Sequence, residues 1–185
     1  FIFVLNSFAH GASCSKANVD LSIAIAIDAS GSVDRNEMRT QLDGFLSAFQ
    51  DDVVVENLLT CHCAEIAISF WATNSSIALP YTVIKDRRSL NTVTSVLSSL
   101  KNSDERVNTL FNLGVSTHVG ESLEFMGDYI LENAAPASLF KILFVSGDGS
   151  NTSDSLDLLR EQRIRLEQND VTVNGLPIII YDDED

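Results

Sequence analysis

The chain has 185 residues, of which 45% are hydrophobic, a length and composition typical of one globular domain with a full core. Twelve Lys and Arg stand against 26 Asp and Glu, so the formal net charge at pH 7 is −14. Because no Lys/Arg cluster interrupts this acidic balance, nucleic acid is excluded as an expected partner. No apolar run reaches the ~18 residues of a membrane-spanning helix, so we expect no membrane span.

The first residues have the character of a secretory signal. Residues 1–8 are apolar and lack an initiator Met, and Ala9-His10-Gly11 has the small-x-small pattern of a signal-peptidase site. We interpret residues 1–12 as a signal peptide remnant, and the alternative is a first strand over residues 1–5. The signal interpretation predicts a secreted or periplasmic protein.

Three cysteines, Cys14, Cys61 and Cys63, leave one thiol unpaired if a disulfide forms. Cys14 precedes the first predicted strand, and the other two precede the second. Neighbouring parallel strands start at the same end of a sheet, so a bridge from Cys14 to Cys61 or Cys63 is geometrically possible. Zinc held by these cysteines with His62 and His118 is the alternative, but the Cys spacing of structural zinc sites is missing.

The first predicted strand, over residues 21–28, leads into a loop rich in oxygen ligands. Large apolar residues alternate with small ones along it, which indicates a strand buried on both sides in a helix-covered sheet. Asp28, Ser30 and Ser32 then follow at every second position, and such an oxygen set suits a hard cation such as Mg²⁺. In the alternative interpretation, Ser32 or Asp34 simply caps the next helix.

Strands and helices alternate along the rest of the chain. We expect helices over residues 34–49, 90–100, 119–130 and 153–167, strands over 64–71, 141–145 and 171–180, a loop over 101–106, and a short antiparallel edge strand over 77–80. Pro80 is expected to end the edge strand, and Asn174-Gly175 to kink the last strand. This alternation predicts an α/β fold with a doubly wound, mostly parallel sheet and helices on both faces.

Two further segments bring polar groups to the expected binding edge. Ligands of open α/β sheets sit outside the carboxyl ends of the strands, where the strand order reverses. Asp28 ends the first strand, Asp148 follows the strand over 141–145, and Thr117 precedes a helix. The alternatives are a turn role for Asp148 and a helix cap for Thr117.

Together, these stretches resemble a known family. Asp28-x-Ser30-x-Ser32, Ser116-Thr117-His118-Val119-Gly120 and Val145-Ser146-Gly147-Asp148-Gly149 are similar to the three-part metal-ion-dependent adhesion site (MIDAS) of von Willebrand factor A domains. With Trp71, Pro80-Tyr81-Thr82 and Val173-Asn174-Gly175-Leu176-Pro177-Ile178, they resemble more closely a domain-of-unknown-function family of bacterial secreted proteins with this fold. The resemblance covers about residues 19–180. It implies a von Willebrand factor A-like, Rossmann-like domain over 19–185 that lacks the family's last helix and strand.

The resemblance also implies a role for each site residue. Ser30, Ser32 and Thr117 would bring hydroxyls to Mg²⁺ (or Mn²⁺ or Ca²⁺), and Asp28 and Asp148 would hold the ion directly or through water. A cation with two carboxylates and neutral hydroxyls keeps positive charge and an open position for a partner's Asp or Glu. We therefore expect a non-enzymatic module that binds a protein ligand presenting Asp or Glu.

Two other classes stay open. In a metal-assisted phosphoester hydrolase, Asp28 and Asp148 would hold Mg²⁺ for chemistry. His118 is the only histidine near this site, no general base is evident, and neither a G-x-S-x-G elbow nor a phosphate-binding loop occurs. The third class is a scaffold whose site has lost its metal.

Overall fold

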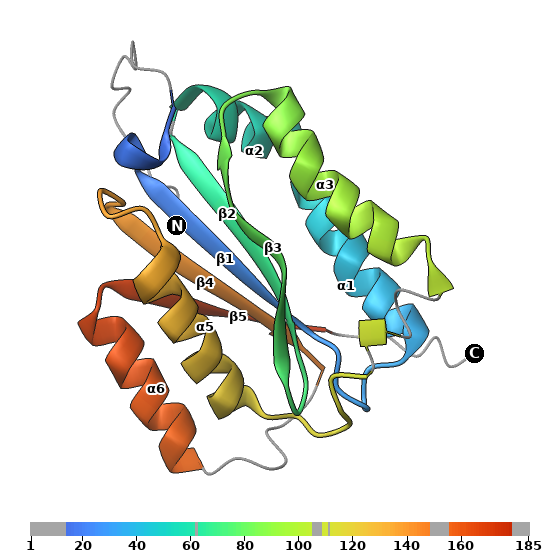
Figure 1. Ribbon diagram of the computed structural model, residues 1–185. Helices are drawn as coiled ribbons and strands as arrows, with labels where there is room; N and C mark the ends of the chain where they lie inside the picture. Colours follow the sequence, from blue (N-terminus) through green and yellow to red (C-terminus); the bar gives the residue numbers. More distant parts are fainter. Residues whose placement is uncertain (1–13, 62, 105–108, 111, 149–155, 179–185) are drawn as a thin grey trace.

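A computed structural model describes residues 14–61, 63–104, 109–110, 112–148 and 156–178 (Figure 1). The signal peptide remnant expected over residues 1–12 lies outside this part of the chain. None of the helices described is long and apolar enough to cross a membrane.

The described residues form a five-stranded sheet in the order β3-β2-β1-β4-β5. The strands are β1 (Leu21–Asp28), β2 (Ala64–Trp71), β3 (Ser75–Ile84), β4 (Phe140–Gly147) and β5 (Val171–Pro177). All neighbours pair in parallel except β3, which is antiparallel to β2. The doubly wound, mostly parallel sheet predicted from the sequence is therefore confirmed. The strand order reverses at β1, between β2 and β4.

Helices cover both faces of this sheet (Figure 1). One face carries α1 (Arg35–Ala48), α2 (Asp52–Glu56) and α3 (Arg87–Lys101), and the other carries α5 (Val119–Asn133) and α6 (Leu156–Gln168). A short 3₁₀ helix, Lys16–Asn18, precedes β1, and a π-helical segment, Asn57–Cys61, follows α2. Neither α2 nor this π-helical segment was predicted, because both are shorter than the periodicity of an amphipathic helix can reveal.

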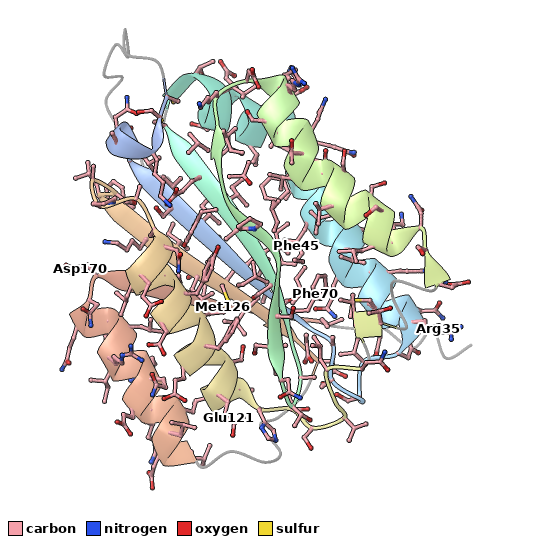
Figure 2. The ribbon with its side chains drawn as sticks, viewed as in Figure 1. Arg35, Phe45, Phe70, Glu121, Met126 and Asp170 are labelled. Atoms are coloured by element: carbon pink, nitrogen blue, oxygen red, sulfur yellow. The ribbon has the colours of Figure 1, made fainter. Side chains whose placement is uncertain are left out.

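The alternation along β1 divides the core into two layers. Ile25 and Ile27 pack under α1 and α3, whereas Ala24 and Ala26 face α5. Figure 2 shows the same division, with Phe45 and Phe70 on the α1 side and Met126 on the α5 side. The strand β1 is therefore buried on both sides, as the sequence pattern indicated.

The face of the sheet that α1 covers is only partly shielded by helices. An apolar groove of about 660 Å³ runs between α1 and the strands β1, β4 and β5, and Phe45, Phe144 and Leu176 line it. Among the described helices, none lies over β4 and β5 on this face (Figure 1). Phe144 and Leu176 therefore stay partly open to solvent.

Two details of the strands differ from expectation. β3 continues through Pro80 instead of ending there, and its pairing with β2 shifts register between Ile66 and Ile68. An edge strand tolerates proline because one side of its backbone needs no ladder hydrogen bond. In β5, Asn174 and Gly175 pair with β4 in unbroken register, so the ladder shows no interruption at the expected kink.

Candidate metal centre

Loops from distant parts of the chain meet at the carboxyl ends of the strands (Figure 1). The loop after β1 contacts the loop before α5, where the Gly31 amide donates to the Val115 carbonyl at 3.0 Å. A Cβ at position 31 would also come within 3.0 Å of that carbonyl oxygen. The tight approach of the two loops, which brings Thr117 to the Asp28 loop, therefore favours glycine at position 31.

A second contact holds the loop before α5 against the end of β2. The Ser116 amide donates to Thr73 Oγ1 at 3.1 Å, and the Asn74 amide donates to the Leu113 carbonyl at 2.9 Å. Gly114 has a φ of 119°, and a Cβ there would overlap the Thr73 side chain. The backbone around Thr117 is thus fixed from two sides.

Asp28 lies at the centre of the site and is fully buried. Its Oδ1 accepts a hydrogen bond from the Ser30 amide at 2.8 Å, whereas Oδ2 has no hydrogen-bond partner among the described residues. Burial raises the pKa of Asp28 from 3.8 to about 6, against the lowering effect of the Ser30 hydrogen bonds, and the nearby Asp148 charge adds to the rise. A buried carboxylate oxygen without a partner is costly unless something else binds it.

A chain of hydroxyls leads from Asp28 toward the surface. Ser30 Oγ and Ser32 Oγ lie 3.1 Å apart, and Ser32 Oγ donates to Asp148 Oδ1 at 2.9 Å. Ser30 is buried, Ser32 is exposed and Asp148 is half-buried. Direct interactions therefore connect four of the five residues expected from the sequence. The site extends from a buried carboxylate at Asp28 to the exposed Ser32 and the half-buried Asp148.

Thr117, the fifth, reaches this edge through its loop and is 3% exposed. It is not the N-cap of α5, because His118 occupies that position. At α1 the cap is Asp34, whose side chain accepts hydrogen bonds from the Asn36 and Glu37 amides. The capping interpretation therefore holds for Asp34 but not for Ser32 or Thr117.

Sequence reasoning missed two residues that position Asp28. Gln41, on α1, donates from Nε2 to the Asp28 carbonyl at 3.0 Å and accepts at Oε1 from Ser146 Oγ at 2.6 Å. Gln41 is spaced from Met38 and Phe45 so that it falls on the apolar face of the helix. A polar side chain at such a position is a sequence signal that could have identified it. Gly147 lies against Asp28 Oδ2, a contact between separate strands that nothing in the local sequence reveals.

The histidine and cysteine alternatives fit the structure poorly. His118 Nδ1 lies 2.9 Å from Glu121 Oε2 at the start of α5, a position that Figure 2 marks by Glu121. Cys63 precedes β2, at the opposite end of the sheet from His118, so a zinc site shared by these two residues is wrong. Nowhere in the described ranges do three His, Cys, Asp or Glu side chains form a group suited to a metal. The side chains of Cys61 and His62 lie outside those ranges.

The donor set around Asp28 does fit a hard divalent cation. It consists of carboxylate and hydroxyl oxygens, the ligands that Mg²⁺, Mn²⁺ and Ca²⁺ prefer. The unpartnered Asp28 Oδ2 is the buried polar atom that such an ion would satisfy. We therefore describe this edge of the sheet as a candidate metal centre.

Comparison with known families agrees with this geometry. Residues 18–185 match a family described as a protein of unknown function (DUF1194). The chain belongs to this family. Comparison with curated proteins gives no match.

Solved structures show which fold this DUF1194 chain adopts. It is similar to proximal thread matrix protein 1 from the mussel byssus with a zinc-occupied MIDAS motif (TM-score 0.63, 14% identity), covering 86% of this chain and 38% of that chain. Manganese-loaded TRAP protein of Plasmodium vivax gives a TM-score of 0.62 at 13% identity, covering 88% of this chain and 58% of that one. A von Willebrand factor type A protein of Catenulispora acidiphila gives 0.60 at 18% identity, with 85% and 33% covered. The chain therefore has a von Willebrand factor A-like fold, and it spans less than two thirds of each of these proteins.

Proposed function

We propose that this domain is a metal-dependent protein-binding module of the adhesion type. In this proposal Asp28, Ser30, Ser32, Thr117 and Asp148 hold Mg²⁺, or Mn²⁺ or Ca²⁺ in its place. The partner is a protein that presents an Asp or Glu side chain, and the module acts outside the cytoplasm without catalysing a reaction.

The observation that carries the proposal is the buried Asp28 carboxylate, whose Oδ2 has no hydrogen-bond partner among the residues that the structure describes. A domain that kept this oxygen only for structure would bear the cost of a buried polar atom without gaining a hydrogen bond. Ser32 and Asp148 continue the same oxygen-rich surface outward to solvent. The metal-loaded state of two proteins with the same fold adds support.

The chain's own residues define what the site can do. When bound, the cation supplies positive charge with a coordination position open to a carboxylate. Asp28 and Ser30 form a rigid buried base, because Gln41 and the Ser30 amide fix Asp28 from two directions. Ser32 and Asp148 lie at the rim, where a partner's side chain can arrive. The proposal assigns binding to this geometry. It gives no catalytic role to His118, whose Nδ1 lies 2.9 Å from Glu121 Oε2.

Calorimetric titration of the full chain with Mg²⁺ and with Mn²⁺ tests the metal. We expect one ion per chain, and we expect Asp28→Asn to abolish binding while circular dichroism shows an intact fold. Asp157→Ala removes an exposed carboxylate from α6 and serves as the control that should bind normally. Absence of heat with the unmutated chain would contradict the proposal and favour a scaffold without metal.

Capture of extracellular proteins by the immobilised chain tests the use of the metal. We expect capture to disappear with chelator and with Thr117→Ala. Since the net charge is −14, moderate salt should leave capture unchanged or improve it, because salt screens repulsion of an acidic partner within about 10 Å at 0.1 M. Capture that persists in chelator would refute the adhesion function. Metal-dependent turnover of a phosphoester that His118→Ala abolishes would instead establish a hydrolase.

A further inference from the structure

Two cysteines lie together at the end of the sheet opposite the candidate metal centre. Cys63 forms a small buried cluster with Val19 and Ala135, and Cys14 and Val83 pack against this cluster. Cys63 is fully buried and Cys14 is half-buried. Although 49 positions separate them along the chain, their side chains are close enough to interact by a hydrogen bond.

The backbone holds these two side chains in place. The Cys63 carbonyl accepts hydrogen bonds from the Asp20 amide at 2.7 Å and the Leu21 amide at 3.2 Å, which aligns the chain before β1 with the start of β2. Asn18 Oδ1 lies 3.8 Å from Cys63 Sγ and also accepts from the Ser15 amide and hydroxyl. The segment that carries Cys14 is therefore folded back onto Cys63.

We propose that Cys14 and Cys63 form a disulfide bond in an oxidising compartment, and that Cys61 remains a free thiol. The sequence left Cys61 and Cys63 as equal candidates. The structure favours Cys63 because its buried thiol interacts with Cys14 by a hydrogen bond, whereas Cys61 ends the π-helical segment Asn57–Cys61. Pairing two side chains already in contact requires little backbone movement.

The oxidant that the reaction needs is a small-molecule disulfide such as oxidised glutathione. The half-buried Cys14, as its thiolate, attacks one sulfur of this disulfide and releases one glutathione thiol. Cys63 then loses its proton and attacks the Cys14 sulfur, which forms the protein bridge and releases the second thiol. Two protein thiols are thereby oxidised, and one glutathione disulfide is reduced to two thiols.

Burial of Cys63 determines when this reaction is fast. Burial and the neighbouring Cys14 raise the pKa of the Cys63 thiol to about 12, so little thiolate exists in the folded reduced domain at neutral pH. Oxidation should therefore be faster during folding, before Cys63 is buried. The finished bridge would join the segment before the 3₁₀ helix Lys16–Asn18 covalently to the residue that precedes β2, far from the candidate metal centre. It does not depend on metal binding.

Refolding of the full chain in a glutathione redox buffer tests the proposal. After alkylation of free thiols, peptide mapping of the unmutated chain should show Cys14 linked to the peptide that contains Cys63, and one alkylated thiol. Because Cys61 shares that peptide, the Cys61→Ser variant makes the assignment, and it should keep the bridge. The bridged form should melt about 10 °C above the reduced form of the same variant.

Two further variants complete the test. Cys14→Ser, at a half-buried position, and Cys63→Ser should both lose the bridge and its gain in melting temperature. Three alkylated thiols in the refolded, unmutated chain would overturn the proposal. So would a bridge that Cys61→Ser abolishes and Cys63→Ser retains, or one that joins Cys61 to Cys63.

Discussion

Gly147, the last residue of β4, lies directly against the carboxylate of Asp28, the last residue of β1. A Cβ at position 147 would come 2.9 Å from Asp28 Oδ2 and 3.4 Å from Trp71 Cζ2. Oδ2 is the oxygen that has no hydrogen-bond partner in the described part of the chain, so the missing side chain at 147 keeps space open beside it. The identity of residue 147 should therefore control access to the candidate metal centre.

Gly147→Ala should weaken metal binding by about tenfold or more, because the new methyl group displaces the Asp28 carboxylate. Calorimetric titration with Mn²⁺ measures the change. Gly175→Ala is the matched control: Gly175 lies on the neighbouring strand β5, and a Cβ there would meet nothing within 4 Å. Equal affinities for the two variants would show that Gly147 does not shape the site.

Metal affinity should fall as the pH is lowered through about 6, the pKa to which burial raises the Asp28 carboxyl. A proton and a cation compete for the same carboxylate, so below this pH the affinity should drop close to tenfold per pH unit. A flat titration profile between pH 5 and 7 would contradict a direct role for Asp28.

The same pKa predicts the opposite trend for stability without metal. Since the folded-state pKa of Asp28 lies above its unfolded value of 3.8, its contribution to stability is fully present below 3.8 and is lost as the pH rises through 6. In chelator, lowering the pH from 7 to 5 should add about 1 kcal/mol to the free energy of unfolding through Asp28. Denaturant unfolding of Asp28→Asn at both pH values supplies the reference, which should lack this increment.

Gln41→Ala should lower the free energy of unfolding by about 1–3 kcal/mol, because the buried Asp28 carbonyl and Ser146 hydroxyl each lose a partner. Metal affinity should also fall by about tenfold, since Gln41 orients Asp28 without touching the ion. Urea unfolding and calorimetry measure the two effects. Thr40→Ala, an exposed change one residue earlier on α1, should alter neither.

Gly114→Ala should destabilise the domain by about 2 kcal/mol, because its φ of 119° and the nearby Thr73 leave no room for a side chain. The displaced loop carries Thr117, so metal affinity should fall as well. Thermal unfolding and Mn²⁺ titration provide the readouts. Gly44→Ala on α1 has open space around it and should be neutral or slightly stabilising. Normal metal binding by Gly114→Ala would show that the loop position is irrelevant.

The sequence alone determined the fold class and the residues of the candidate site. Alternation along β1 and the 3.6-residue spacing of apolar residues in α1, α3 and α5 are local sequence patterns. From these patterns the doubly wound sheet could be predicted. The order of strands and helices then placed Asp28 and Asp148 at the same edge. Oxygen-bearing residues at short spacing could be recognised there without coordinates.

The tertiary structure decided what surrounds those residues. Whether Ser32 caps a helix or contacts Asp148 depends on a hydrogen bond between residues 116 positions apart. The gap beside Asp28 depends on Gly147, and the proposed pairing of Cys14 with Cys63 rests on the packing of Cys14. Each is a contact between segments distant in the chain. Local propensity carries no information about such contacts, because they form only when the strands have been brought into register.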